Sequence, residues 1–120
     1  MALALPGTRE AEGRFAFFVR HGSKDRAFVW AWNERVEPKK PRVPRDDVVA
    51  VRVVDLQDKD ALLASGEAAL FTEPHYDGYR AVLVRLPLVG RRRLRELIED
   101  AWRCQAPRAL VQEFERARRR

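Results

Sequence analysis

The chain has 120 residues, of which 46% are hydrophobic and 35% are charged, a balance typical of a folded domain and not of a disordered chain. No apolar run approaches the roughly 18 residues that a membrane-spanning helix needs. A single cysteine, Cys104, excludes an internal disulfide framework and a cysteine-based zinc finger. The net charge of +6 and a high isoelectric point are typical of proteins that bind polyanions.

Two strands joined by a turn are predicted near the N-terminus. Residues 14–20 are rich in aromatic and branched side chains, and residues 26–32 repeat that composition after turn residues at 21–25. Because side chains alternate along a strand, one face of the second strand is expected to carry three aromatic residues, Phe28, Trp30 and Trp32. We interpret this face as part of the core; a stacking platform for single-stranded bases is the alternative.

A basic, proline-rich stretch follows from residue 33 to residue 47. Pro38, Pro41 and Pro44 exclude a helix or a central strand there, so a long loop or an irregular edge hairpin is expected. Five of its cations are candidate contacts to DNA phosphates: Arg35, Lys39, Lys40, Arg42 and Arg45. The prolines would reduce the entropy that the loop loses on binding. A solvated surface loop without a function is the alternative.

The middle of the chain predicts a strand, a short helix and a second strand. Residues 48–54 are nearly all β-branched and indicate the first of these strands. Asp55 or Asp58 then caps a helix that runs to residue 64, and Gly66 suits the left-handed position after it. Residues 81–86 form the later strand, which Pro87 ends.

A turn cluster at residues 73–79 carries the most catalytic-looking side chains in the chain. They are His75, Tyr76, Asp77 and Tyr79. A histidine titrates near neutral pH and an aspartate can orient it, but the Asp-Gly pair in this cluster is first of all a turn signal. We therefore prefer a turn without catalytic function.

Neither a metal site nor a cofactor is predicted. Two histidines and one cysteine show no ligand spacing, and the chain lacks a glycine-rich phosphate loop and a serine elbow. Cys104 would need His21 or His75 beside it to act as a nucleophile, so we interpret it as a thiol without function.

From about residue 90 the hydrophobic period becomes that of an amphipathic helix, with a stripe formed by Leu94, Leu97, Ile98, Ala101 and Trp102. Pro107 opens a last helix with an apolar side. Arginines gather at the start of the first of these helices: Arg91, Arg92, Arg93 and Arg95. Free N–H groups at a helix start favour phosphate, whereas the helix dipole disfavours clustered cations. We therefore take Arg91, Arg92 and Arg93 as a second candidate DNA contact.

The order of these elements predicts one α+β domain over residues 1–120. Strands, a short helix, a strand and then two helices are typical of a two-layer antiparallel β-sheet with helices packed on one face. The apolar stretch Met1 to Leu5 is too short for a signal peptide and has no basic residue before it. With a lone cysteine, a cytoplasmic location is expected.

Four blocks of the chain have a recognisable order and spacing: residues 2–8, 14–27, 58–64 and 94–108. Together they resemble the MmcQ/YjbR-like family, in which they correspond to the end of an N-terminal helix, the first hairpin, a short helix and the closing block. That family is described as carrying a double-wing DNA-binding fold, so the resemblance implies DNA binding by basic hairpins without enzymatic activity. The chain departs from the family in its N-terminal helix, which is almost absent.

The sequence thus predicts a small non-enzymatic protein that contacts DNA through phosphate with little base readout, with no cofactor and no membrane segment. A missing N-terminal helix would leave an apolar sheet face open, which favours a second hypothesis, a protein–protein adaptor or a chaperone-like homodimer. A third hypothesis, an enzyme, would require a cleft around His75.

Overall fold

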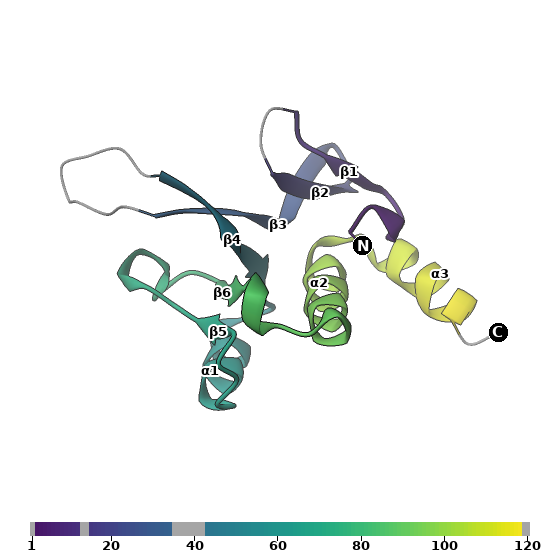
Figure 1. Cartoon of the computed structure of the whole chain (residues 1–120). Helices are drawn as coiled ribbons and strands as arrows, with labels where there is room; N and C mark the ends of the chain where they lie inside the picture. Colours follow the sequence, from purple (N-terminus) through teal and green to yellow (C-terminus); the bar gives the residue numbers. More distant parts are fainter. Residues whose placement is uncertain (1, 13–14, 35–42, 119–120) are drawn as a thin grey trace.

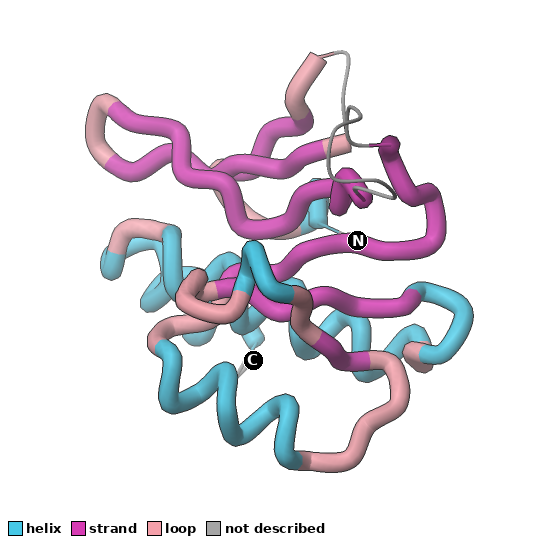
Figure 2. The backbone as a smooth tube through the Cα atoms, turned by 90° about the vertical axis from the view of Figure 1, so that its left-hand side faces the viewer, coloured by secondary structure: helices cyan, strands magenta, loops and turns pink. Residues whose placement is uncertain are grey.

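The computed structural model describes residues 2–12, 15–34 and 43–118. Six strands form one sheet in the order β1-β2-β3-β4-β6-β5, with every neighbouring pair antiparallel. The strands are β1 (Thr8–Glu10), β2 (Ala16–His21), β3 (Lys24–Glu34), β4 (Val43–Arg52), β5 (Leu70–Phe71) and β6 (Ala81–Arg85). The helices are α1 (Leu56–Ala64), α2 (Arg91–Gln105) and α3 (Arg108–Arg118). Figure 1 labels these elements, and Figure 2 shows the helices gathered on one side of the strands. The predicted α+β class is confirmed.

Elements with strong local signals lie where the sequence predicts them. The Asp55 carboxylate accepts a hydrogen bond from the N–H of Asp58 at 2.7 Å and so caps α1. A turn at Gly22 and Ser23 joins β2 to β3, with Gly22 at a φ of +64°. The short strand β5 precedes the turn at residues 73–79, and three short 3₁₀ turns lie in other connections: η1 (Ala2–Ala4), η2 (Pro74–Tyr76) and η3 (Leu86–Leu88).

The main core lies between the sheet and α2. The predicted stripe of α2 buries Leu97, Ile98, Ala101 and Trp102 against this face. Trp102 is fully buried, and its Nε1–H donates to the Pro6 carbonyl at 3.0 Å, which fixes the N-terminal segment on the helix. The helix α3 packs against α2 through Phe114, whose ring centroid lies 5.0 Å from that of Trp102.

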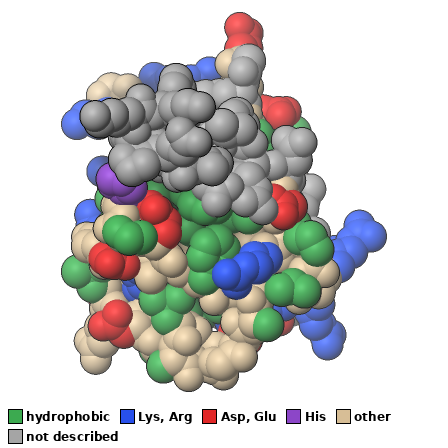
Figure 3. All heavy atoms as spheres, turned by 60° about the vertical axis from the view of Figure 1, so that its left-hand side comes forward, with side chains coloured by type: hydrophobic (Ala, Val, Ile, Leu, Met, Phe, Trp, Pro, Cys, Tyr) green, Lys and Arg blue, Asp and Glu red, His purple; other side chains and the backbone are tan. Residues whose placement is uncertain are grey.

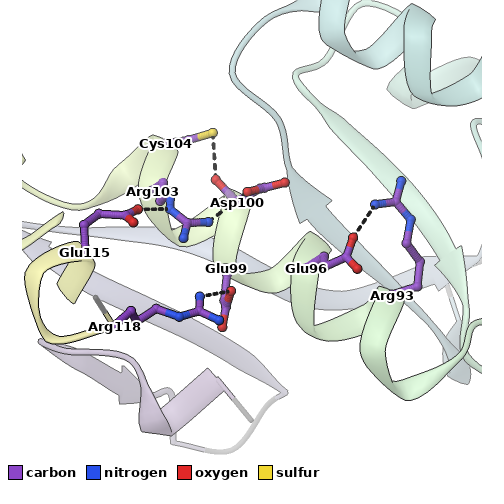
Figure 4. A network of polar contacts seen from close by, with 8 residues as sticks. All are labelled: Arg93, Glu96, Glu99, Asp100, Arg103, Cys104, Glu115 and Arg118. Atoms are coloured by element: carbon purple, nitrogen blue, oxygen red, sulfur yellow. Dashed lines mark hydrogen bonds and ion pairs between the residues drawn. The ribbon is translucent and has the colours of Figure 1, made fainter. Parts of the chain in front are cut away.

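Two ion pairs add to this contact between the last two helices (Figure 4). Arg103 Nε lies 2.7 Å from Glu115 Oε1, and Arg118 Nη1 lies 2.7 Å from Glu99 Oε2. Both pairs are partly exposed, so each contributes at most about 1 kcal/mol. The aromatic contact and the buried stripe of α2 therefore hold α3 in place more than the charges do.

The prediction that Phe28 shares a face with Trp30 and Trp32 is wrong. The pairing of β2 with β3 shifts between Phe17 and Phe18, which leaves Phe28 as an extra residue in β3. A bulge of this kind reverses the alternation of side chains. Phe28 therefore belongs to the core under α2, whereas Trp30 and Trp32 lie in the smaller cluster on the opposite face.

The strands β3 and β4 extend further into the proline-rich stretch than predicted. Asn33 pairs with Pro44, and the register of the two strands shifts between Ala31 and Asn33. β6 pairs with β4 only from Val48 to Arg52, so Pro44 lies where β4 has a neighbour on one side. A proline is tolerated there because no second strand needs its N–H. The predicted irregular hairpin is thus present at the ends of these two strands.

Candidate functional site

The arginine group at the start of α2 divides into free and engaged side chains. Arg91 and Arg92 are exposed, and no described carboxylate pairs with them. Arg93 instead places Nε 2.7 Å from Glu67 Oε1 and Nη2 3.0 Å from Glu67 Oε2. This bidentate contact raises the pKa of Arg93 and lowers the pKa of Glu67. The DNA contact predicted for Arg93 stays a prediction, in competition with Glu67.

Arg93 also contacts Glu96 one turn later on the same helix, with 3.3 Å between Nη1 and Oε2 (Figure 4).

Arg91 and Arg95 line a hollow of about 320 Å³ between α2 and α3, together with Arg118. Glu99 lines the same hollow and pairs with Arg118, so this place is less positive than its arginine content indicates.

The five cations of the predicted basic stretch lie outside the part of the chain whose side chains the structure describes. Arg35, Lys39, Lys40 and Arg42 lie outside the described residues, and Arg45 lies in β4 with its side chain also outside them. The strand ends that flank the stretch, Glu34 and Val43, project away from the start of α2 (Figure 1). The structure therefore does not bring these strand ends beside the arginines of α2.

A hollow of about 500 Å³ lies at the other end of the same strands, beside the last turn of α2. Its lining comprises Asp25, Arg26, Ala27, Arg52, Val53, Val54, Arg80, Cys104 and Gln105. Three of these residues are arginines, one from β3, one from β4 and one from the turn before β6. We call this group, Arg26, Arg52 and Arg80, the arginine hollow.

The arginines of the hollow have no acidic partner among the described residues. Asp25 lines the hollow, but it forms an ion pair with Arg9 and lies 3.9 Å from Arg20. The carboxylate is thus shared by two arginines outside the lining. The hollow consequently carries a net positive charge.

Arg52 is the most firmly held of the three. Its guanidinium carbon lies 5.0 Å from the ring centre of Tyr79 and 5.6 Å from that of Trp30, and Nη2 donates to the Tyr79 hydroxyl at 3.3 Å. The Nε atom of Arg52 is buried and has no acceptor. A buried N–H without an acceptor is costly, so Arg52 keeps a donor that no described residue satisfies.

Basic charge is not spread evenly over the molecule. On the face drawn in Figure 3, described hydrophobic and acidic side chains are interspersed, and the described Lys and Arg side chains form no continuous patch. This face is therefore not uniformly positive.

Sequence analysis missed the arginine hollow because its members are separated along the chain. Residue 26 follows a hairpin, residue 52 ends a strand and residue 80 precedes another. Arg52 pairs with Ala81 in the β4–β6 register, which places it beside Arg80. The only signal in the sequence is that each arginine stands at one end of a strand.

Cys104 also lines this hollow, and the raised pKa of its thiol keeps the thiol protonated at neutral pH. Burial, together with Asp58 and Asp100, raises the pKa of Cys104 to about 11. The thiol donates to the Asp100 carbonyl at 3.1 Å. The nearby His21 donates from Nδ1 to the Gln105 carbonyl at 3.1 Å and makes no contact with the sulfur.

In the turn at residues 73–79, Tyr76 is half-buried, whereas His75 and Tyr79 are exposed. The Tyr76 hydroxyl accepts a hydrogen bond from Trp30 Nε1 at 3.1 Å, so this tyrosine packs on the sheet. His75 lines neither of the two arginine-containing hollows. Within the described residues, no three His, Cys, Asp or Glu side chains lie together as metal ligands would, and no helix is long and apolar enough to cross a membrane.

The chain is similar to three uncharacterized mycobacterial proteins, one from Mycobacterium bovis and two from Mycobacterium tuberculosis. Each is 54% identical to it over 71 residues, which cover 59% of this chain and 55% of the relative. The chain thus spans about half the length of the curated relatives it matches. No family model and no solved structure matches the chain. Membership of the MmcQ/YjbR-like family therefore stays a prediction.

Proposed function

We propose that this protein binds DNA through its phosphates, without catalysing a reaction, and that the arginine hollow makes the principal contacts. The observation that carries the proposal is the convergence of Arg26, Arg52 and Arg80 on one hollow without a described acidic partner. Like charges held together repel one another, and a bound phosphate removes that repulsion.

The chemistry of the lining suits a phosphate group. Guanidinium groups present planar pairs of donors that match two phosphate oxygens. Arg26 and Arg80 are exposed and can adjust, whereas Arg52 is held on two aromatic rings. A site with one fixed and two mobile cations grips the backbone and reads no base, as expected for contacts that position without specifying sequence.

Two further observations support DNA as the polyanion. The predicted resemblance to MmcQ/YjbR-like proteins implies a DNA-binding fold. Arg91 and Arg92 are exposed at the first turn of α2, where free N–H groups favour phosphate. Arg91 and Arg92 would add phosphate contacts along the same DNA strand whose backbone the arginine hollow binds.

The test compares two double variants that lose the same charge. Arg26→Gln with Arg80→Gln removes two of the three arginines of the hollow and leaves Arg52. Arg108→Gln with Arg116→Gln removes two exposed arginines of α3 that line neither arginine-containing hollow. Fluorescence anisotropy with labelled random duplex and random single-stranded DNA, at 50 and 200 mM salt, measures the slope of log K against log salt. Heparin serves as the competing polyanion.

We expect the hollow variant to reduce the salt slope by about 1.5, because each phosphate contact contributes roughly 0.7 to 0.9. The α3 variant should keep most of the slope. Equal losses in the two variants would mean that only net charge matters, and the hollow would be dismissed. Absence of binding at 50 mM salt would reject DNA binding itself.

A second candidate function, a protein–protein adaptor or homodimer, is favoured by one apolar opening. A hollow of about 260 Å³ between the sheet and α2 is lined only by apolar side chains, among them Phe15, Phe17 and Leu94. Phe15 is 48% exposed there. A dimer that uses this opening would persist in sedimentation at high salt, whereas DNA binding through phosphate would fade.

A further inference from the structure

We infer that the DNA which this protein binds is single-stranded, with one base stacked on Tyr79 while a neighbouring phosphate occupies the arginine hollow. This inference rests on the proposed function and adds to it the form of the nucleic acid. Tyr79 lies beside the hollow but does not line it.

Tyr79 offers an aromatic surface next to the cations. The residue is 45% exposed and, with Phe15, is one of two exposed aromatic residues among the large hydrophobic side chains of the described chain. Arg80, the next residue, lines the hollow, and Arg52 lies over the Tyr79 ring and donates to its hydroxyl. A stacking surface and a phosphate site are thus joined through Arg52, within the reach of one nucleotide.

The ring is held in place before any ligand arrives. It meets Tyr76 and Trp30 in edge contacts, with centroid separations of 5.7 and 6.2 Å. The Tyr79 carbonyl accepts a hydrogen bond from the buried ammonium of Lys59 at 2.8 Å, which fixes the backbone. A side chain ordered in advance loses little entropy when a base packs on it.

An aromatic ring beside a phosphate site favours single-stranded DNA over a duplex. The bases of a duplex are stacked on one another and paired, so they cannot reach an aromatic ring on a protein surface. A single strand turns a base out at little cost, and stacking plus phosphate contacts is how such strands are held without sequence preference. The alternative stacking platform on β3 does not compete, because Trp32 is only 7% exposed and Phe28 is buried on the opposite face.

The decisive comparison uses the unaltered protein with three DNA probes of equal length. These are a thymidine strand, a strand with the same phosphates and abasic sites instead of bases, and a duplex. We expect the thymidine strand to bind about tenfold more tightly than the abasic strand, the usual effect of one stacked base. The duplex should bind no better than the abasic strand.

Variants of Tyr79 test whether its ring causes the preference for the thymidine strand over the abasic strand. Tyr79→Leu should lose about tenfold more affinity for the thymidine strand than for the abasic strand, because any loosening of Arg52 affects both strands alike, and it should keep the salt slope. Tyr79→Phe keeps the ring and should retain most of the affinity, which separates stacking from the hydrogen bond to Arg52. Phe15→Leu is the matched control, because Phe15 is exposed to a similar extent at the apolar opening.

The outcomes distinguish this inference from the proposal beneath it. If duplex and thymidine strand bind equally and Tyr79→Leu changes nothing, stacking on Tyr79 is refuted while DNA binding stands. If Tyr79→Phe is as weak as Tyr79→Leu, the Tyr79 hydroxyl acts by holding Arg52, and the stacking inference is refuted. If none of the probes binds at 50 mM salt, the proposed function itself is rejected.

Discussion

Replacing Lys59 by methionine tests the one buried cation of the described residues, which joins α1 to the turn that carries Tyr79. Lys59 is 2% exposed, and its ammonium donates to the carbonyls of Tyr76 and Tyr79. Methionine keeps most of the length and the apolar stem and removes only the charged donor. The variant therefore isolates what these two hydrogen bonds contribute to stability.

The expected loss follows from opposing effects. Hydrogen bonds from a charged donor contribute about 1.5 to 3 kcal/mol each, whereas burying an ammonium costs several kcal/mol. Neither carbonyl is left without a donor, because the N–H of Tyr79 donates to Tyr76 at 2.9 Å and that of Ala81 donates to Tyr79 at 2.8 Å. We expect Lys59→Met to lower the free energy of unfolding by about 2 kcal/mol and Tm by about 8 °C.

Urea denaturation followed by circular dichroism measures this loss, with Lys24→Met as the control at an exposed lysine of the β2–β3 hairpin. The control should stay within about 0.5 kcal/mol of the unaltered protein. A Lys59→Met protein as stable as the control would refute the reasoning that these hydrogen bonds outweigh the burial of the charge.

The free energy of unfolding is also expected to depend on pH through Lys59. Burial lowers the pKa of Lys59 below its ordinary value of 10.5. Between the lowered pKa and 10.5 the unfolded chain binds more protons than the folded protein, so stability contributed at this site rises with pH. The difference in unfolding free energy between the two proteins should therefore change across this window, and a constant difference would contradict a lowered pKa.

Two further predictions concern the N-terminal turn and the lone thiol. Gly7→Ala should lower the free energy of unfolding by about 2 kcal/mol, because Gly7 has a φ of +70° and an added Cβ would lie 2.9 Å from Leu110 Cδ2. Gly22→Ala is the control: Gly22 has a φ of +64° but open space around it, so the loss should be about 1 kcal/mol. Equal losses in chemical denaturation would show that Leu110 yields freely. Cys104 should react slowly with iodoacetamide at pH 7 and faster as the pH approaches about 11, while rapid alkylation of the folded protein at pH 7 would contradict the raised pKa.

Sequence alone determined the elements whose signals are local. The caps of α1, the turn at Gly22 and the apolar stripe of α2 each depend on residues within a few positions of one another. Hydrogen bonds and periodicity over such short spans follow from neighbouring side chains. The order of these elements was then enough to predict an antiparallel sheet with helices on one face.

Only the tertiary structure decided which side chains meet across the sheet. A single extra residue in β3 moves Phe28 to the face opposite Trp30, and no local signal marks the bulge. The pairing of β4 with β6 brings Arg52 beside Arg80, and the fold sets Glu67 against Arg93. Clusters of charge along the sequence therefore do not reveal the arginine hollow, because strand register, not chain proximity, places its side chains at one site.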